Sequence, residues 1–198
     1  MGKGELTRQA ILEKATALAS SIGLGGLTIG KLAEELELSK SGLFAHFGSK
    51  ESLQVAILER AADRFVELII RPALRAPRGE PRLRSLFEHW RQWPKLYSMP
   101  GGCIFVAASV ELDGQPGPAR DLLVKQQRDW LDVLASTVRG AITEGHFRKD
   151  VDPEQFAHDL YGAMLIYHHA LWLLRDPKAE KRAVRAFENL VEAARRPQ

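Results

Sequence analysis

Two lysines directly follow serines within residues 35–50, which read ELELSKSGLFAHFGSK. Serine side chains often cap helix N-termini, so Ser39 and Ser49 place Lys40 and Lys50 in the first turn of a helix. The helix macrodipole disfavours a cation there by about 0.3–1 kcal/mol. The free N–H groups at a helix start bind phosphate well, and a nucleic-acid phosphate would turn both lysines into favourable contacts. The alternative is that both are solvated surface lysines.

Catalytic or metal chemistry has little to build on in this sequence. The candidate groups are Cys103, His158, His168 and His169. His158 and His169 would share a helix face, but they lie eleven residues apart, which is about 16 Å along a helix axis. The sequence contains no G-x-S-x-G, H-E-x-x-H, CxxC or glycine-rich phosphate-loop motif. We therefore expect no enzyme, no metal site and no cofactor.

Length and composition are typical of a globular protein. The 198 residues carry a net charge of +3, and residues 1–52 hold as many acidic as basic side chains. An argument for nucleic acid therefore depends on where the charges lie. The N-terminal MGKGELTRQA lacks an apolar signal region. The most apolar run, residues 161–174, is too short to span a bilayer. The single cysteine excludes an internal disulfide, and a cytoplasmic protein is expected.

Helical periodicity dominates the chain, and no segment predicts a strand. The candidate helix caps are Thr7, Thr28, Ser39 and Ser49. Gly23 is expected to end the first helix, the third covers residues 40–47, and the fourth ends near Pro72. Further helices are predicted near residues 82–93, 102–112, 118–146, 154–175 and 177–195, and Pro94 is expected to end or kink the first of these. The fold class is therefore all-α, with about nine helices.

The alternation of charged and apolar residues from Glu35 to Leu38 has the period of a strand. Because helical segments lie on both sides, we interpret it as the end of the second helix followed by a turn. Leu36 and Leu38 are then both expected to face a small core. The resulting short helix, turn and second short helix have the spacing of a helix-turn-helix.

The helix over residues 40–47 has two different faces. Leu43 and Phe47 are four residues apart and share the face expected to be buried. The opposite face carries Lys40, Ser41, Phe44 and Ala45. A large aromatic ring at the edge of this face, beside a cation, indicates a surface that contacts a partner.

The N-terminal part of the chain resembles the DNA-binding domain of the TetR (tetracycline repressor) family of bacterial transcriptional regulators. The resemblance covers residues 7–58, about a quarter of the chain. It is carried by Gly23, Leu27-Thr28, Ala33, Ser39-Lys40 and the pattern Phe47-x-x-Lys50-x-x-Leu53. It implies a helix-turn-helix DNA-binding domain over residues 1–52 and a ligand-binding and dimerisation domain over residues 53–198.

The same resemblance implies that seven residues lie at the DNA: Thr28, Lys40, Ser41, Gly42, Phe44, His46 and Lys50. The helix over residues 40–47 would be the recognition helix in the major groove. Lys40 and Ser41 would read base edges, and Gly42 would permit close backbone approach. The other four residues would lie at or near phosphates. His46 has an alternative interpretation as a surface histidine without a DNA contact.

Two residues depart from the pattern of the family. Position 44 is usually tyrosine, whose hydroxyl reaches a phosphate, so Phe44 is expected only to pack along the sugar-phosphate backbone. Glu37 occupies a turn position where glycine is usual. A left-handed backbone there would strain Glu37 by about 1 kcal/mol, and a differently shaped turn is the alternative. Gly30 leaves the second helix without a side chain that could reach a base.

The rest of the chain is expected to dimerise and to bind a small molecule, as the resemblance implies. The helix predicted at residues 154–175 is apolar on nearly every side from Leu160 onward and must be covered all round. The helix at residues 177–195 carries an apolar stripe of its own. A homodimer through helices near 154–175 and 177–195 would cover both helices. A monomer whose own core buries everything is the alternative.

Aromatic side chains gather in this C-terminal part. The candidate ligand-binding residues are Phe65, Trp90, Trp93, Cys103, Phe105, Trp130, Tyr161 and His168. Each aromatic residue has an alternative interpretation as ordinary core. Cys103 is expected to be a small buried hydrophobe, with a redox sensor as the alternative.

The function expected from these patterns is sequence-specific DNA binding by a transcriptional regulator. It would be a repressor, released from a palindromic double-stranded DNA operator by a small-molecule effector. The alternative is a ligand-independent helical protein that binds DNA as an architectural component or binds other proteins. The aromatic-rich C-terminal part is larger than dimerisation needs, which favours control by a ligand.

Overall fold

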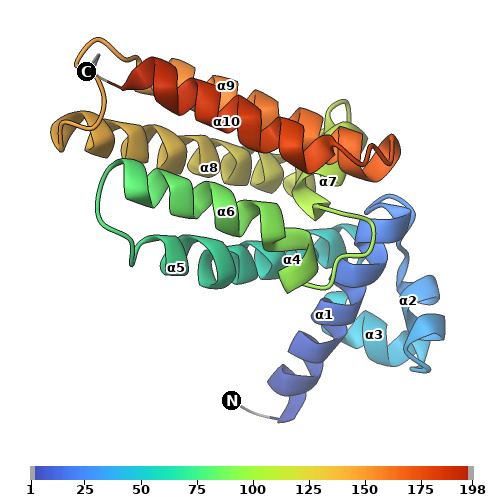
Figure 1. Ribbon diagram of the computed structural model, residues 1–198. Coiled ribbons are helices and arrows are strands. Elements are labelled where there is room, and N and C mark those ends of the chain that lie inside the picture. The colour runs from blue at the N-terminus through green and yellow to red at the C-terminus, as the bar shows by residue number, and fades with distance from the viewer. Residues whose placement is uncertain (1–2, 196–198) are drawn as a thin grey trace. The chain divides into compact units, whose positions relative to one another are not determined.

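The structure is a computed structural model that describes the backbone of residues 3–195 and the side chains of residues 7–195. Helices account for most of this part of the chain (Figure 1). In chain order the elements are α1 (Lys3–Ile22), α2 (Ile29–Glu35), α3 (Lys40–Phe47), α4 (Lys50–Phe65), the π-helical η1 (Val66–Ile70), α5 (Arg71–Ala73), α6 (Glu80–Leu96), α7 (Ile104–Leu112), α8 (Pro118–Thr143), α9 (Pro153–His168), the π-helical η2 (His169–Leu173) and α10 (Ala179–Ala194). Since η1 joins α4 to α5 and η2 extends α9, residues 3–195 form nine continuous helices and no strand, and the all-α prediction is confirmed.

Some predicted helix ends differ from the structure. Helix α1 begins at Lys3, so Thr7 lies inside the helix and its predicted role as a cap is wrong. Helix α6 continues through Pro94 to Leu96 before it ends. The long fourth helix is interrupted by the π-helical turn η1, after which Pro72 lies at the start of α5, where its missing N–H is tolerated.

By packing, the chain forms two compact units. The first comprises Met1–Val66 and Trp93–Gln126, and the second comprises Glu67–Gln92 and Gln127–Gln198. Each unit therefore joins two segments that are distant in the sequence. The first holds α1 to α4 together with α7, and the second holds α9, η2 and α10.

In the first unit, α1 packs on α4 and α7, and α3 packs on α2 and α4 (Figure 1). The apolar residues that fill the space between these helices include Ile11, Leu12, Ala15, Leu27, Leu32, Leu43, Leu53 and Ile57, all of them buried. At the edge of this core the Arg60 guanidinium donates to the Glu13 carboxylate, with Nε 3.0 Å from Oε1, and joins α4 to α1. The Arg8 guanidinium lies 5.4 Å from the centre of the Phe47 ring. Helix α3 therefore packs against a buried apolar core formed with α2 and α4.

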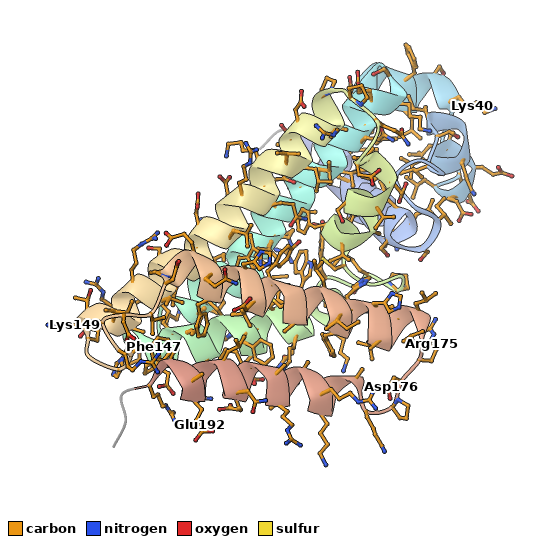
Figure 2. All side chains as sticks on the ribbon, turned by 90° about the horizontal axis from the view of Figure 1, so that it is seen from above. Lys40, Phe147, Lys149, Arg175, Asp176 and Glu192 are labelled. Atoms are coloured by element: carbon orange, nitrogen blue, oxygen red, sulfur yellow. The ribbon has the colours of Figure 1, made fainter. Side chains whose placement is uncertain are left out.

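In the second unit, α9 packs along α10, and the turn that joins them contains Arg175 and Asp176 (Figure 2). Helix α6 packs on α10 through stacked rings, with the centres of Phe87 and Phe187 4.2 Å apart. Beside these rings the Arg84 guanidinium forms a bidentate pair with Glu188, with N···O distances of 2.6 and 2.9 Å.

Acid should weaken this α6–α10 contact. Glu80, whose side chain is 12% exposed, accepts hydrogen bonds from Arg195 and Arg84. The hydrogen bond from Arg195, aided by that from Arg84, holds the pKa of the Glu80 carboxyl below its usual value against the opposing effect of burial. A carboxyl whose pKa is depressed in the folded state stabilises the fold above its unfolded pKa and loses that contribution as the pH falls through the folded pKa.

We therefore expect the free energy of unfolding to fall as the pH drops below about 4.3, the ordinary pKa of glutamate. In Glu80→Gln this pH dependence should be shallower, as urea denaturation at a series of pH values would measure. Glu192→Gln, which removes an exposed carboxylate from α10, is the matched control and should follow the wild type. Equal slopes for wild type and Glu80→Gln would contradict the expectation.

Candidate nucleic-acid interface

The three helix starts of the helix-turn-helix region are capped as predicted. The Thr28 hydroxyl oxygen accepts from the Lys31 N–H at 3.1 Å, that of Ser39 accepts from the Gly42 N–H at 3.1 Å, and that of Ser49 accepts from the Ser52 N–H at 3.0 Å. These bonds satisfy donors that a helix start leaves open. They fix where α2, α3 and α4 begin, and with them the direction in which the first turn of α3 points.

The α2–α3 turn departs from the expectation in one residue. Leu36 is half-buried, but Leu38 is 44% exposed, so the prediction that both leucines face the core is wrong for Leu38. Glu37 between them has a φ of +52°, so its backbone is left-handed and the predicted strain applies. The left-handed backbone at Glu37 breaks the strand-like alternation of residues 35–38. Leu36 and Leu38 therefore do not share one buried face.

All seven residues predicted at the DNA are exposed: Thr28, Lys40, Ser41, Gly42, Phe44, His46 and Lys50. The Phe44 ring is 57% exposed, whereas Leu43 and Phe47 on the other face of α3 are buried. Lys40 lies at the outer edge of its unit (Figure 2). Helix α3 therefore presents one face with a cation, small residues and an unburied aromatic ring.

Lys40 folds back across the start of α2. A Cβ atom placed on Gly30 would lie 3.4 Å from Lys40 Cε and 3.7 Å from Nζ, which is ordinary van der Waals contact, so the lysine side chain lies alongside Gly30. The side chain of Lys40 is therefore exposed beside the start of α2.

Lys50 has a partner inside the protein. Its Nζ donates to the Gly25 carbonyl oxygen at 2.5 Å, in the turn between α1 and α2. Gln54, one helical turn further along α4, donates its Nε2 to the Leu24 carbonyl at 3.1 Å. The sequence contained no signal for either bond, because the partners lie 25 and 30 residues apart. Lys50 therefore holds the turn from an exposed position at the start of α4.

Four of the predicted ligand-binding residues lie in the first unit, and the structure brings them together. The Phe65 ring packs edge-on against Trp93 and Phe105, with ring centres 5.2 and 6.0 Å away. Trp93 has no exposed surface and also stacks on Tyr97. Cys103 is buried, and burial raises the pKa of its thiol, which disfavours the thiolate that oxidation needs.

The other four ligand candidates lie in the second unit. Trp90 packs against Tyr167, with ring centres 5.8 Å apart, and Trp130 is 8% exposed. The Tyr161 hydroxyl donates to the Gln127 side-chain carbonyl. Burial, with a smaller effect from His169, lowers the pKa of His168 to about 4, so that imidazole is neutral at pH 7. These rings supply apolar surface and a neutral imidazole.

The second unit leaves a strip of apolar surface uncovered along α9 and η2. Its members are Leu165, Ile166, Leu173 and Leu174, between 36% and 69% exposed. The alternative in which the monomer buries everything is therefore wrong. The apolar stripe of α10 differs, since Ala183, Phe187 and Val191 are buried within the protomer.

Metal and membrane chemistry find no support in the part of the chain that is described. Residues 7–195 contain no group of three His, Cys, Asp or Glu side chains that could hold a metal ion. Over the described range, each helix is too short or too polar to cross a bilayer. The exposed face of α3 and the strip on α9 and η2 each combine several exposed side chains that a partner could contact.

Two family models match the chain. The model described as "Bacterial regulatory proteins, tetR family" matches residues 11–57, the segment that carries the exposed face of α3. The model described as "Tetracyclin repressor-like, C-terminal domain" matches residues 79–187, more than half of the chain. Together they cover the capped helix-turn-helix and most of the second unit.

Individual proteins that are similar to this chain are also transcriptional regulators. The HTH-type transcriptional repressor AcnR of Corynebacterium glutamicum is 36% identical over 63 residues, which are 32% of this chain and 34% of that repressor. The match thus spans about a third of the length of this relative. A putative regulator from Saccharomonospora viridis, solved with choline, has a TM-score of 0.84 at 22% identity and covers 98% of this chain and 100% of that one. AibR, solved with isovaleryl coenzyme A and operator DNA, has a TM-score of 0.74 at 24% identity, with 96% and 99% covered. At these identities the two structures show a shared fold alone.

Proposed function

Because the chain belongs to the tetracycline repressor (TetR) family of bacterial regulatory proteins, we propose that it is a repressor that a small-molecule effector releases from a palindromic DNA operator. Residues 1–52 bind the DNA, and residues 53–198 bind the effector and dimerise. The observation that carries the proposal is the exposed face of α3, on which Lys40, Ser41 and Phe44 are all exposed while Leu43 and Phe47 on the other face are buried.

Helix α3 enters the major groove in this proposal. Lys40 is placed to donate to the O6 and N7 acceptors of a guanine, and Ser41 to either partner of a base pair. Gly42 lets the backbone approach the groove closely. Thr28, His46 and Lys50 lie at the phosphates, while Phe44 packs on the sugar-phosphate backbone without the hydrogen bond that a tyrosine would make.

The regulator acts as a homodimer for two reasons. A second copy would bury the apolar strip on α9 and η2, and a palindromic operator has two half-sites that each bind one DNA-binding domain. A second copy laid on Leu165, Ile166, Leu173 and Leu174 would bury these side chains at about 25 cal/mol for each Å² of apolar surface removed from water. The exposed side of α10 borders the same interface. Two copies of α3 would then be held about 34–36 Å apart, one turn of DNA.

The effector binds among the aromatic side chains of residues 53–198. Support comes from two proteins of similar fold, one solved with choline and the other with isovaleryl coenzyme A. Ligand binding that displaces α4, which starts at Lys50 and carries Phe65 at its end, would shift the spacing of the two α3 helices away from the operator. The protein performs no catalysis in this scheme.

Fluorescence anisotropy with the region upstream of the gene for this protein tests the proposal. The wild type should bind that duplex more tightly than a shuffled duplex of the same composition, and one member of a metabolite panel should weaken binding. Equal affinity for both duplexes would exclude a sequence-specific regulator. Specific binding that no metabolite changes would favour the ligand-independent alternative.

Lys40→Ala and Lys50→Ala should differ in kind. Loss of Lys40 should cost about 1–3 kcal/mol at one base position and relax the preference for that base. Loss of Lys50 should weaken all sequences alike and lower the slope of log affinity against log salt by about 1. Competition anisotropy across single-base operator variants and salt concentrations measures both effects. Lys149→Ala removes the same charge from an exposed residue between α8 and α9, away from the proposed DNA and dimer surfaces, and serves as the control. Identical profiles for the two variants would mean that Lys40 contacts only phosphate.

A further inference from the structure

The turn between α1 and α2 is held by a carboxylate from a distant part of the chain. Glu111, on α7, accepts the N–H of Leu24 at 3.2 Å through Oε1 and the N–H of Gly25 at 2.7 Å through Oε2. These partners are 87 and 86 residues apart in sequence. Two successive backbone N–H groups that converge on one anion form a compact and strong binding arrangement.

The turn is shaped to admit this carboxylate. Gly23 has a φ of +80°, and a Cβ atom there would lie 2.6 Å from Glu111 Oε1, which is closer than real Cβ atoms come. A Cβ atom on Gly25 would lie 3.1 Å from Oε2. Glycine at both positions therefore serves the approach of Glu111 as well as the end of α1.

The carbonyl groups of the same two residues are held by α4. The Gly25 N–H points to the carboxylate of Glu111, while its carbonyl accepts from the ammonium of Lys50. The Leu24 carbonyl likewise accepts from Gln54. The turn is thus held between an anion on α7, which contacts backbone N–H groups, and a cation on α4, which contacts a backbone carbonyl. Three residues after Gly25 the chain reaches Thr28, which caps α2.

We propose that Glu111 is a positioning residue for DNA binding, which fixes the α1–α2 turn and through it the placement of Thr28, α2 and α3. The proposal rests on the proposed function, since it needs a protein that binds DNA. The two hydrogen bonds of Glu111 would then connect α7 directly to the DNA-binding domain. Helix α7 carries Phe105, a member of the aromatic cluster, near its start and Glu111 near its end. A ligand that moves Phe105 would also move the carboxylate that holds the turn.

The sign of the effect separates this role from general electrostatics. Glu111→Gln and Glu111→Ala both remove a negative charge, and that change alone should strengthen binding to a polyanion. The positioning role predicts the opposite. Affinity should fall in the order wild type, Glu111→Gln, Glu111→Ala, because glutamine keeps one acceptor and alanine keeps none. The alanine variant should lose roughly 5- to 150-fold, the usual range of coupling between linked sites.

The experiment combines anisotropy with amide hydrogen exchange on the full-length protein. The probe is a fluorescein-labelled duplex from the region upstream of its own gene, used at a temperature at which circular dichroism shows every variant folded. Peptides that contain Leu24 and Gly25 should exchange faster in both Glu111 variants, while peptides from the middle of α4 stay unchanged. Glu59→Gln, which removes an exposed charge from α4, should bind as tightly as the wild type or slightly more tightly.

Two results would overturn the role of Glu111. One is affinity in Glu111→Ala equal to or above that of the wild type, and the other is weaker binding with unchanged exchange at Leu24 and Gly25. A failure of the proposed function would look different. In that case the wild-type protein itself would bind this duplex no more tightly than a shuffled one.

Discussion

Replacement of Trp93 by alanine should lower the free energy of unfolding by about 3–5 kcal/mol, the usual cost of truncating a buried Trp or Phe. Trp93 has no exposed surface and packs against Phe65, Tyr97 and Phe105. Because its neighbours are rigid rings, and Phe65 and Phe105 also contact each other, the surroundings cannot collapse fully into the space. The remaining cavity adds to the lost transfer free energy.

Urea denaturation followed by circular dichroism would measure this change. Leu96→Ala is the matched control, because Leu96 lies three residues further along α6 and is 44% exposed. It should cost well under about 1.5 kcal/mol, since much of its surface is already in water. A Trp93→Ala cost below about 1 kcal/mol would contradict the packed cluster and would mean that the ring borders empty space.

Ile166→Glu should convert the dimer to a monomer and reduce operator affinity by about 10²–10⁴-fold, the range by which linking two binding modules raises avidity. Ile166 is 60% exposed on the strip formed by α9 and η2. Two copies of the protein would bring two carboxylates into the apolar interface, where unpaired charges are strongly disfavoured. Each monomer would then hold DNA with one recognition helix.

Sedimentation equilibrium measures the first effect, and anisotropy with the intact palindrome measures the second. Leu74→Glu makes the same exchange at a residue that is 51% exposed at the end of α5, away from the strip, and should leave the dimer intact. With an isolated half-site, Ile166→Glu should bind as well as the wild type. A dimeric Ile166→Glu protein would move the interface elsewhere.

Local chemistry explains which parts of the fold were predictable. The caps at Thr28, Ser39 and Ser49 are confirmed because a cap depends on donors two or three residues away. The start of α1 was missed because Gly4 has a low helix propensity and Thr7 is a good cap, so the sequence favours a later start than Lys3, where the helix begins. Helix ends of this kind are decided by packing more than by propensity.

The site was predictable where a single helix carries it and unpredictable where distant segments meet. The exposed face of α3 follows from the four-residue spacing of Leu43 and Phe47, and the structure confirms that these two are buried. Glu37 could be expected in a left-handed turn, but the resulting exposure of Leu38 could not. Glu111 carries no local signal, since a single glutamate near the end of an apolar helix is ordinary until the fold brings Leu24 to it.

The turn held by Glu111 also limits how this regulator can be taken apart. A chimera that joined residues 1–52 to the effector-sensing half of another protein would separate Leu24 and Gly25 from the carboxylate that accepts their N–H groups. Such a graft would keep the residues of α3 that we propose to read bases, but it would lose two of the contacts that hold the α1–α2 turn. A biosensor design should therefore transfer α7 together with residues 1–52. During synthesis, likewise, the α1–α2 turn cannot gain these two contacts until the ribosome has added Glu111, more than half of the way along the chain.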